Sequence, residues 1–221
     1  MKLCLAVATL AVLSLGATLT RADSLTVQLT GVSVSDGQYY VLPYELSIDG
    51  VTTDAICYDA LHEISMNQIW QANADTLDQA ANTGEFSSSG YSTAYTGYEE
   101  AAWLGSQWFT GQVSTPQQQI DLQYMIWDVY DPTAEPLNQS DPYIIYLQAN
   151  EAAGVASLNT ADFTFLEPVP DDHGNLAQAF LLYTPGNQEN PYTTPESGSW
   201  VLVVIGAVLI GVAKARFAGV A

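Results

Sequence analysis

Alternating apolar and polar residues dominate the first part of the chain. Leu25, Val27 and Leu29 alternate with polar residues, and a period of two is typical of a half-buried β-strand. Asp36-Gly37 and Asp49-Gly50 are strong turn signals that separate further runs of this kind. The pattern therefore predicts three consecutive strands, at residues 25–34, 38–48 and 51–58.

Pro43 falls within the second of these predicted strands. Proline has no N–H group to donate to the hydrogen-bond ladder of a sheet, so within strands it is confined to edges and bulges. We therefore expect an edge or a bulge at this position.

The pattern changes to a helical one in the middle of the chain. Residues 98–109 carry acids in their first turn, where the helix dipole favours them, and Pro116 suits the first turn of a second helix. Residues 64–81 are ambiguous and predicted to be helical in part, whereas residues 82–96 are rich in Gly, Ser, Thr and Tyr and are typical of an exposed loop. Helices are predicted at 98–109, 116–130 and 142–152, and strands return at 161–166 and 178–183.

The order of these elements predicts the fold class. Strands at both ends that flank a helical middle favour one α+β domain, here over residues 23–184. About 160 residues suffice for one domain with a substantial core.

The N-terminal segment is predicted to be a secretory signal peptide. Residues 1–22 combine Lys2, an apolar run, and small residues around a cleavage site after Ala22. The protein is therefore expected to be exported.

The C-terminal part is predicted to be a linker followed by a membrane anchor. Residues 185–198 are rich in Pro, Gly, Asn, Thr and Ser, as in an extended tether. Residues 200–213 are uniformly apolar, and Lys214 and Arg216 follow them. This pattern predicts a single transmembrane helix whose basic end lies in the cytoplasm.

The same end of the chain carries a motif. Pro195-Glu196-Ser197, the apolar segment, and then Lys214 and Arg216 resemble the sorting tail of PEP-CTERM proteins, which Gram-negative producers of exopolysaccharide export. The family motif usually reads Pro-Glu-Pro. The resemblance covers residues 195–221 and implies that an exosortase-like enzyme processes the tail near Pro195-Glu196. The protein would then pass from the inner membrane to the cell surface or extracellular matrix.

The charge of the chain is strongly one-sided. It has 24 acidic and 4 basic residues, a formal net charge of −20, and residues 22–213 contain neither Lys nor Arg. This excludes nucleic-acid binding by phosphate neutralisation, a P-loop, a lysine Schiff base and Lys–Asn crosslinks in the domain. An apolar content of 48% indicates a folded domain rather than a disordered acidic tail.

Cys57 is the only cysteine that remains after signal cleavage, so it can form no intramolecular disulfide. It could be a buried apolar residue, form an intermolecular disulfide, or enter another covalent bond. Gln123 is a candidate partner, because Gln123, Tyr124 and Trp127 share the apolar face of one predicted helix. A buried amide needs a partner, and the alternative is a hydrogen-bonded core glutamine.

Three segments together carry a second resemblance: Cys57-Tyr58-Asp59 at a strand end, a helix with Glu100-Ala101-Ala102-Trp103-Leu104, and Leu122-Gln123-Tyr124-Met125-Ile126-Trp127. They resemble the thioester domain of bacterial surface adhesins over residues 37–131, a pattern that also occurs in exported PEP-CTERM proteins of unknown role. The resemblance implies that the Cys57 thiol condenses with the Gln123 amide and expels ammonia. The implied pocket consists of Tyr58, Asp59, Trp103, Tyr124 and Trp127.

A thioester would give the absence of lysine a meaning. It is an activated acyl group that amines open, and this domain has no side-chain amine with which to quench itself. Burial against Trp127 and Tyr124 would exclude water and slow hydrolysis. The alternative is that general acidity suits solubility in a salty or polyanionic matrix.

An enzymatic alternative uses the histidines. His62 lies five residues after Cys57, and a Cys–His pair is a known nucleophile arrangement. His173, with Asp171 or Asp172, would complete a transglutaminase-like triad.

Several acidic residues suggest a calcium site. Candidate oxygen ligands stand close together in the sequence at Asp128, Asp131 and Asp141. No EF-hand spacing is present, so a solvated acidic loop is the alternative, and no metal or cofactor is otherwise expected.

We therefore expect an exported, acidic surface adhesin, not a conventional enzyme, whose thioester captures an amine-bearing or polysaccharide-associated surface target. One alternative is a non-covalent structural or exopolysaccharide-associated protein with an inert cysteine. The other is a Cys-dependent transferase or hydrolase.

Overall fold

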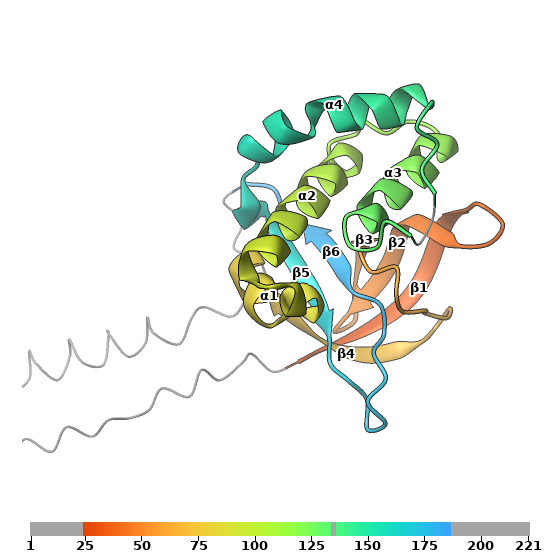
Figure 1. Ribbon diagram of the computed structural model, residues 1–221. Coiled ribbons are helices and arrows are strands. Elements are labelled where there is room, and N and C mark those ends of the chain that lie inside the picture. Colours follow the sequence, from red (N-terminus) through yellow and green to blue (C-terminus); the bar gives the residue numbers. More distant parts are fainter. Residues whose placement is uncertain (1–23, 134–135, 187–221) are drawn as a thin grey trace, which may run out of the picture. The chain divides into compact units, whose positions relative to one another are not determined.

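The computed structural model describes residues 24–133 and 136–186 (Figure 1). The predicted signal peptide, the sorting motif and the apolar segment at 200–213 lie outside the described residues, as does nearly all of the linker.

Six strands close into an antiparallel barrel. Their order around the barrel is β1-β2-β3-β6-β5-β4, and β4 pairs back onto β1. The strands are β1 (Leu25–Ser35), β2 (Tyr40–Ile48), β3 (Val51–Cys57), β4 (Ile69–Asp75), β5 (Phe163–Pro168) and β6 (Phe180–Tyr183).

The predicted α+β class, with strands at both ends flanking a helical middle, was therefore wrong, whereas the predicted C-terminal transmembrane helix at 200–213 lies outside the described residues. The strands from both ends of the domain form one closed barrel, and the helices are inserted between β4 and β5. Closure depends on β4, where Leu25 pairs with Ala72 and Gln28 with Ile69. This strand lies in the stretch 64–81 that the sequence left ambiguous. Among the described residues, no helix has the length and apolar character needed to cross a membrane.

In the described part of the chain, four α-helices and two short 3₁₀ helices accompany the barrel. Thr76 and Thr115 begin α1 and α3 with capping boxes, in which Gln79 and Gln118 bond back to the cap residue. The predicted exposed loop at 82–96 was wrong, because it contains a 3₁₀ helix and the first turns of α2. The helices are α1 (Leu77–Thr83), η1 (Glu85–Ser89), α2 (Tyr91–Phe109), α3 (Pro116–Asp128), α4 (Pro142–Ala156) and η2 (Thr160–Asp162).

Two apolar clusters follow from the alternation of side chains along the strands. All six strands contribute to the inner cluster, which fills the barrel, and α3 adds Trp127 and Tyr124 to it. The outer cluster lies between the strands and the helices, which gather on one side of the barrel with α4 outermost (Figure 1). Strand members of the inner cluster include Val27, Leu46, Ala55, Cys57, Trp70, Leu166 and Phe180.

A bulge interrupts β2 at the predicted place. Val32 pairs with Tyr44 and Val34 with Val41, so Leu42 and Pro43 both lie opposite a single residue of β1. The prediction of an edge or bulge at Pro43 is confirmed as a bulge. The Leu42 N–H group is thereby left outside the strand ladder and donates to a side chain of α3 instead.

A buried carboxylate joins the barrel to the helices. Glu167 on β5 accepts hydrogen bonds from the hydroxyls of Tyr58 (2.8 Å) and Tyr98 (2.5 Å), and from the backbone N–H of Glu85 (2.9 Å). No Lys or Arg lies between residues 22 and 213, so hydroxyl and amide donors, rather than a basic side chain, stabilise this buried carboxylate.

Gly154 is required for the packing of α4 on α2. A Cβ atom there would lie 1.7 Å from Nε1 of Trp103, whose indole is rigid and buried. We therefore expect Gly154→Ala to lower the free energy of unfolding by about 1–3 kcal/mol. Helix propensity alone would raise it by about 1 kcal/mol. Urea unfolding gives the sign of the change in stability. Adding Trp103→Leu to Gly154→Ala should recover part of any lost stability. A Gly154→Ala protein more stable than the wild type would contradict this packing.

Stability should decrease as the pH rises above 4.5. Burial raises the pKa of Glu100, Asp121 and Glu167, and burial beside Asp59 and Glu167 raises the pKa of Glu85 to about 8. Because these folded pKa values exceed the unfolded ones, the stabilisation is complete below the unfolded pKa, 4.5 for Glu, and is lost as the pH rises through the folded values. The last part of the loss should come near pH 8.

Urea unfolding followed by tryptophan fluorescence at pH 4.5 and above pH 8 measures this effect. Three carboxyls have the opposite effect on the pH dependence, because hydrogen bonds lower their pKa values: Asp36, Asp131 and Asp171. Their contribution to stability is lost only below their ordinary pKa of 3.8, outside the pH range compared. Equal or greater stability above pH 8 would refute the expectation.

Candidate functional site

Cys57 lies at the end of β3 and points into the inner cluster. It is fully buried, its backbone pairs with Phe180 of β6, and it forms no disulfide. Its Sγ donates a hydrogen bond to the carbonyl oxygen of Asp59 at 3.0 Å. The thiol is thus fixed by a local turn rather than exposed for reaction with solvent.

Gln123 on α3 meets Cys57 inside the protein. Its Nε2 donates to the Cys57 carbonyl oxygen at 2.6 Å, and its Oε1 accepts the Leu42 N–H at 3.2 Å. Gln123 is itself fully buried. The structure therefore brings together the two residues that the sequence singled out, with both ends of the amide held by backbone groups.

Trp127 and Tyr124 extend from the same helix over this point. The Tyr124 ring stacks on Trp127 at a centroid distance of 5.7 Å, and Tyr39 packs edge-on against Trp127 at 5.8 Å. The Tyr124 hydroxyl donates to Asp36 in the turn between β1 and β2. These contacts tie α3 to the β1–β2 hairpin and cover the inner cluster.

The environment keeps the thiol protonated. Burial raises the pKa of Cys57 well above its ordinary value, and the Asp59 carboxylate adds to the rise. The Trp127 indole N–H opposes this rise of the pKa, because the N–H group would stabilise the thiolate. In the folded protein Trp127 Nε1 is buried and makes no hydrogen bond within normal geometry.

The other predicted pocket residues are divided between two places. Asp59 lies beside the Cys57 thiol, because its backbone carbonyl accepts the hydrogen bond from Sγ. Tyr58 points the opposite way, into the outer cluster, where its hydroxyl donates to Glu167. Trp103 belongs to the outer cluster as well and packs against Gly154 of α4. The structure therefore does not place Tyr58 and Trp103 beside the thiol.

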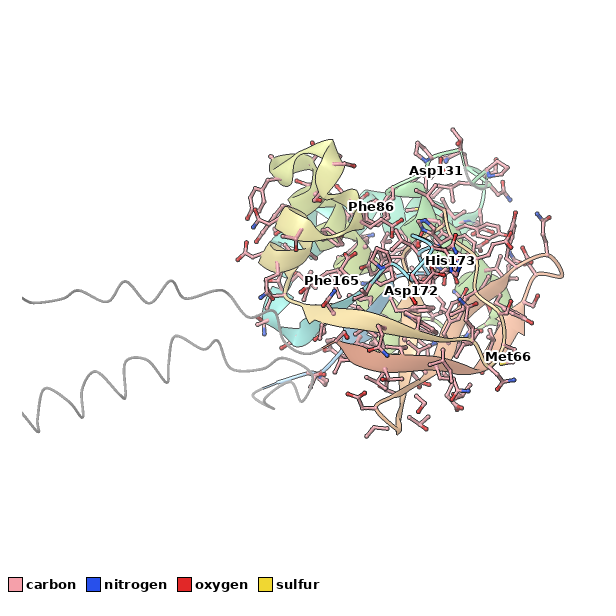
Figure 2. All side chains as sticks on the ribbon, turned by 90° about the horizontal axis from the view of Figure 1, so that it is seen from below. Met66, Phe86, Asp131, Phe165, Asp172 and His173 are labelled. Atoms are coloured by element: carbon pink, nitrogen blue, oxygen red, sulfur yellow. The ribbon has the colours of Figure 1, made fainter. Side chains whose placement is uncertain are left out.

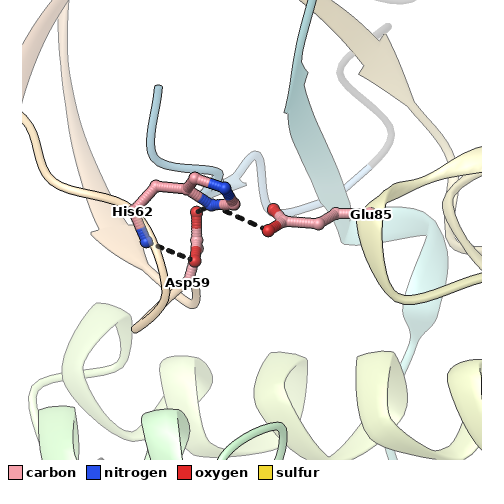
Figure 3. A group of neighbouring side chains, drawn as sticks. All are labelled: Asp59, His62 and Glu85. Atoms are coloured by element: carbon pink, nitrogen blue, oxygen red, sulfur yellow. Dashed lines mark hydrogen bonds and ion pairs between the residues drawn. The ribbon is translucent and has the colours of Figure 1, made fainter. Parts of the chain in front are cut away.

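Asp59 also belongs to a group of three ionisable side chains (Figure 3). His62 Nδ1 lies 2.9 Å from Asp59 Oδ2 and 2.8 Å from Glu85 Oε1. The three potential ligand atoms lie within 4.8 Å of one another, so these residues could hold a metal ion. The sequence indicated His62 only as a partner for the thiol, and it gave no signal for Glu85, which η1 brings from another part of the chain.

The residues proposed for a catalytic triad are not assembled around Cys57. Asp171 accepts the backbone N–H groups of His173 and Asn175, and this exposed turn lies in the β5–β6 connection, where Figure 2 labels Asp172 and His173. Neither histidine makes a hydrogen bond with Cys57 in the described part of the chain. His62 is instead directed at carboxylates.

The candidate calcium ligands are also dispersed. Asp141 caps α4 by accepting the Tyr143 N–H, whereas Asp131, labelled in Figure 2, accepts hydrogen bonds from Thr133. Asp128 lies on α3. Within residues 24–133 and 136–186, the single group with metal-ligand geometry is Asp59, His62 and Glu85.

Comparisons with protein families, curated proteins and solved structures find no match to this chain. A functional proposal therefore rests on the sequence and on the contacts of the described residues, above all those of Cys57 and Gln123.

Proposed function

We propose that the protein is an exported cell-surface protein in which Cys57 and Gln123 condense to an internal thioester, which then captures amines covalently. The observation that carries this proposal is the position of the Gln123 amide. It is fully buried, and its nitrogen donates to the backbone carbonyl of Cys57 while its oxygen accepts the backbone N–H of Leu42.

Thioester formation is a substitution at the amide carbon. The Cys57 sulfur forms a bond to Cδ of Gln123, the Cδ–Nε2 bond breaks, and the amide nitrogen leaves as ammonia with the thiol proton. No oxidant or further reactant is required. The thiol has to lose its proton as it attacks, and the nearby Trp127 N–H is placed to lower the cost of negative charge on sulfur.

The bulge in β2 supports the step. Leu42 N–H donates to Gln123 Oε1, the atom on which negative charge develops in the tetrahedral intermediate. That N–H is available because Leu42 lies outside the strand ladder. A backbone donor is fixed before the reaction, so it stabilises the developing charge without rearrangement.

The surroundings favour survival of the product. The barrel interior excludes water, and the stacked Tyr124 and Trp127 cover the bond on the side of α3. Residues 22–213 supply no lysine amine that could open the thioester from within. An amine from outside would have to displace the Tyr39 and Tyr124 rings, and Tyr39 is already 36% exposed.

The cellular setting rests on the two ends of the chain. The signal-peptide pattern at 1–22 and the PEP-CTERM-like motif at Pro195-Glu196-Ser197 support export, processing by an exosortase-like enzyme and presentation on the surface or in the matrix of a Gram-negative bacterium. The capture target would be an amine-bearing or polysaccharide-associated partner, since the lack of basic residues disfavours nucleic acid.

A non-covalent matrix protein is the second candidate, and one observation favours it. The thiol already has a satisfied hydrogen bond to Asp59, and its raised pKa is that of an inert buried cysteine. In that case Gln123 is a hydrogen-bonded core residue that fixes α3 to β2 and β3.

Mass spectrometry of the purified full-length chain separates these two. A thioester makes the protein lighter than its sequence by one ammonia, and proteolysis in acid should yield a peptide that joins Cys57 to Gln123. Methylamine should open the bond, leaving a free thiol and an N-methyl group on Gln123. We expect Cys57→Ala and Gln123→Glu to abolish both signals.

Gln119→Glu is the matched control, because it makes the same change on α3 at a half-buried site, and it should retain both signals. A wild-type mass equal to the sequence, with a Cys57 thiol that alkylates after unfolding, would sink the thioester and leave the matrix protein as the function.

A further inference from the structure

We propose that Asp59, His62 and Glu85 form a binding site for one divalent transition-metal ion, with zinc as the ion. The site is separate from the proposed thioester and does not depend on it. Asp59 contributes its carboxylate to the site, whereas only its backbone carbonyl contacts the thiol.

Three ligand atoms converge from two distant segments. Asp59 and His62 lie in the connection after β3, and Glu85 begins η1 (Figure 3). His62 Nδ1 stands between Asp59 Oδ2 and Glu85 Oε1, at 2.9 Å and 2.8 Å. The cluster is therefore assembled by the tertiary fold rather than by a run of acids in one loop.

With both carboxyls ionised, as metal ligands have to be, the cluster carries more negative charge than its protein partners offset. The Asp59 side chain is fully buried and that of Glu85 is 10% exposed, yet among the described residues one imidazole is the only basic group beside them. Glu167 is a third carboxylate close by, and it accepts the backbone N–H of Glu85. Residues 22–213 hold no Lys or Arg that could balance these groups. A divalent cation would do so.

Glu85 provides a second, independent indication of a ligand. Its carboxylate oxygens are buried, and no donor of the described residues reaches them in hydrogen-bond geometry; His62 lies beside Oε1 outside that geometry, and the other near group is the Asp59 carboxyl. Buried carboxylate oxygens almost always have partners. An ion held at this point would satisfy the oxygens that the protein leaves unpaired.

The donor set favours zinc over calcium. Calcium takes six to eight oxygen ligands, whereas this site offers one imidazole nitrogen and two carboxylates. One imidazole and two carboxylates suit zinc, with water at an open fourth position. His62 is 29% exposed, so one side of the site is open to solvent.

The carboxylate of Asp59 is oriented in advance. Its Oδ1 accepts the backbone N–H of Leu61 at 2.7 Å and that of His62 at 3.2 Å, which leaves Oδ2 directed at the cluster. Supporting hydrogen bonds of this kind fix the geometry of a ligand and raise metal affinity.

Calorimetric titration of the full-length chain with zinc chloride, after treatment with a chelator and its removal, tests the site. We expect one zinc ion per chain and a higher unfolding temperature with zinc. His62→Gln and Glu85→Gln should lower the affinity by about tenfold or more. The matched controls are His173→Gln and Glu63→Gln, which change the same residue types at exposed positions and should bind as the wild type does.

Glu85→Gln guards against a trivial loss of folding. It preserves shape and removes the repulsion between two carboxyl groups, so the metal-free variant should be at least as stable as the wild type while losing the stabilisation by zinc. Equal zinc affinity in the wild type and both site variants would overturn the proposal. So would an absence of zinc binding, or binding of calcium alone. Cys57→Ala should retain zinc, and a loss there would move the site to the thiol.

Discussion

A domain without lysine or arginine has to bury carboxylates without basic partners, and this constraint runs through the structure. Desolvation of an unpaired carboxylate is costly, so each buried one needs another solution. Glu167 has two tyrosine hydroxyls and a backbone N–H. Asp59 has two backbone N–H groups and an imidazole. Glu85 has a close contact with the same imidazole but, among the described residues, no donor in hydrogen-bond geometry, which leaves it the least satisfied of the three.

The same constraint connects to the chemistry proposed for the barrel interior. A domain that holds an activated acyl group has to avoid amines, and the side-chain amines are the ones that the sequence lacks between residues 22 and 213. Removing basic residues to protect a thioester would leave carboxylates unpaired elsewhere in the fold. Hydroxyl donors, raised carboxyl pKa values and a bound cation are the remaining ways to accommodate them. One compositional feature would thus account for both the proposed thioester and the proposed metal site.

The sequence predicted local elements better than their assembly. Turn signals and period-two alternation found β1, β2 and β3, and Pro43 marked the bulge. β4 was missed because Ile69–Asp75 mixes apolar and polar residues without a clear period, and its identity depends on pairing with β1 and β5, which are distant in sequence. Without β4 the closed barrel could not be anticipated. The Cys57–Gln123 contact could be anticipated, because a lone cysteine and a glutamine on an apolar helix face each need a partner. Glu85 could not, since nothing in its local sequence shows that η1 brings it to His62.

The proposed thioester and the proposed metal site meet at Asp59 but use different atoms of it. The carbonyl of Asp59 accepts from the thiol inside the barrel, while its carboxylate lies with His62 at the edge of the solvent. Acylation of Cys57 would remove the S–H donor and break the first contact, but it would leave the backbone N–H bonds that orient the carboxylate. The segment after β3 can therefore keep its shape through the reaction. A metal ion at Asp59, His62 and Glu85 would strengthen that shape, since it would tie this segment to η1 across the domain. The fold would in this way separate a buried site for the proposed thioester, at the end of β3, from a partly exposed site for charge in the connection that follows this strand.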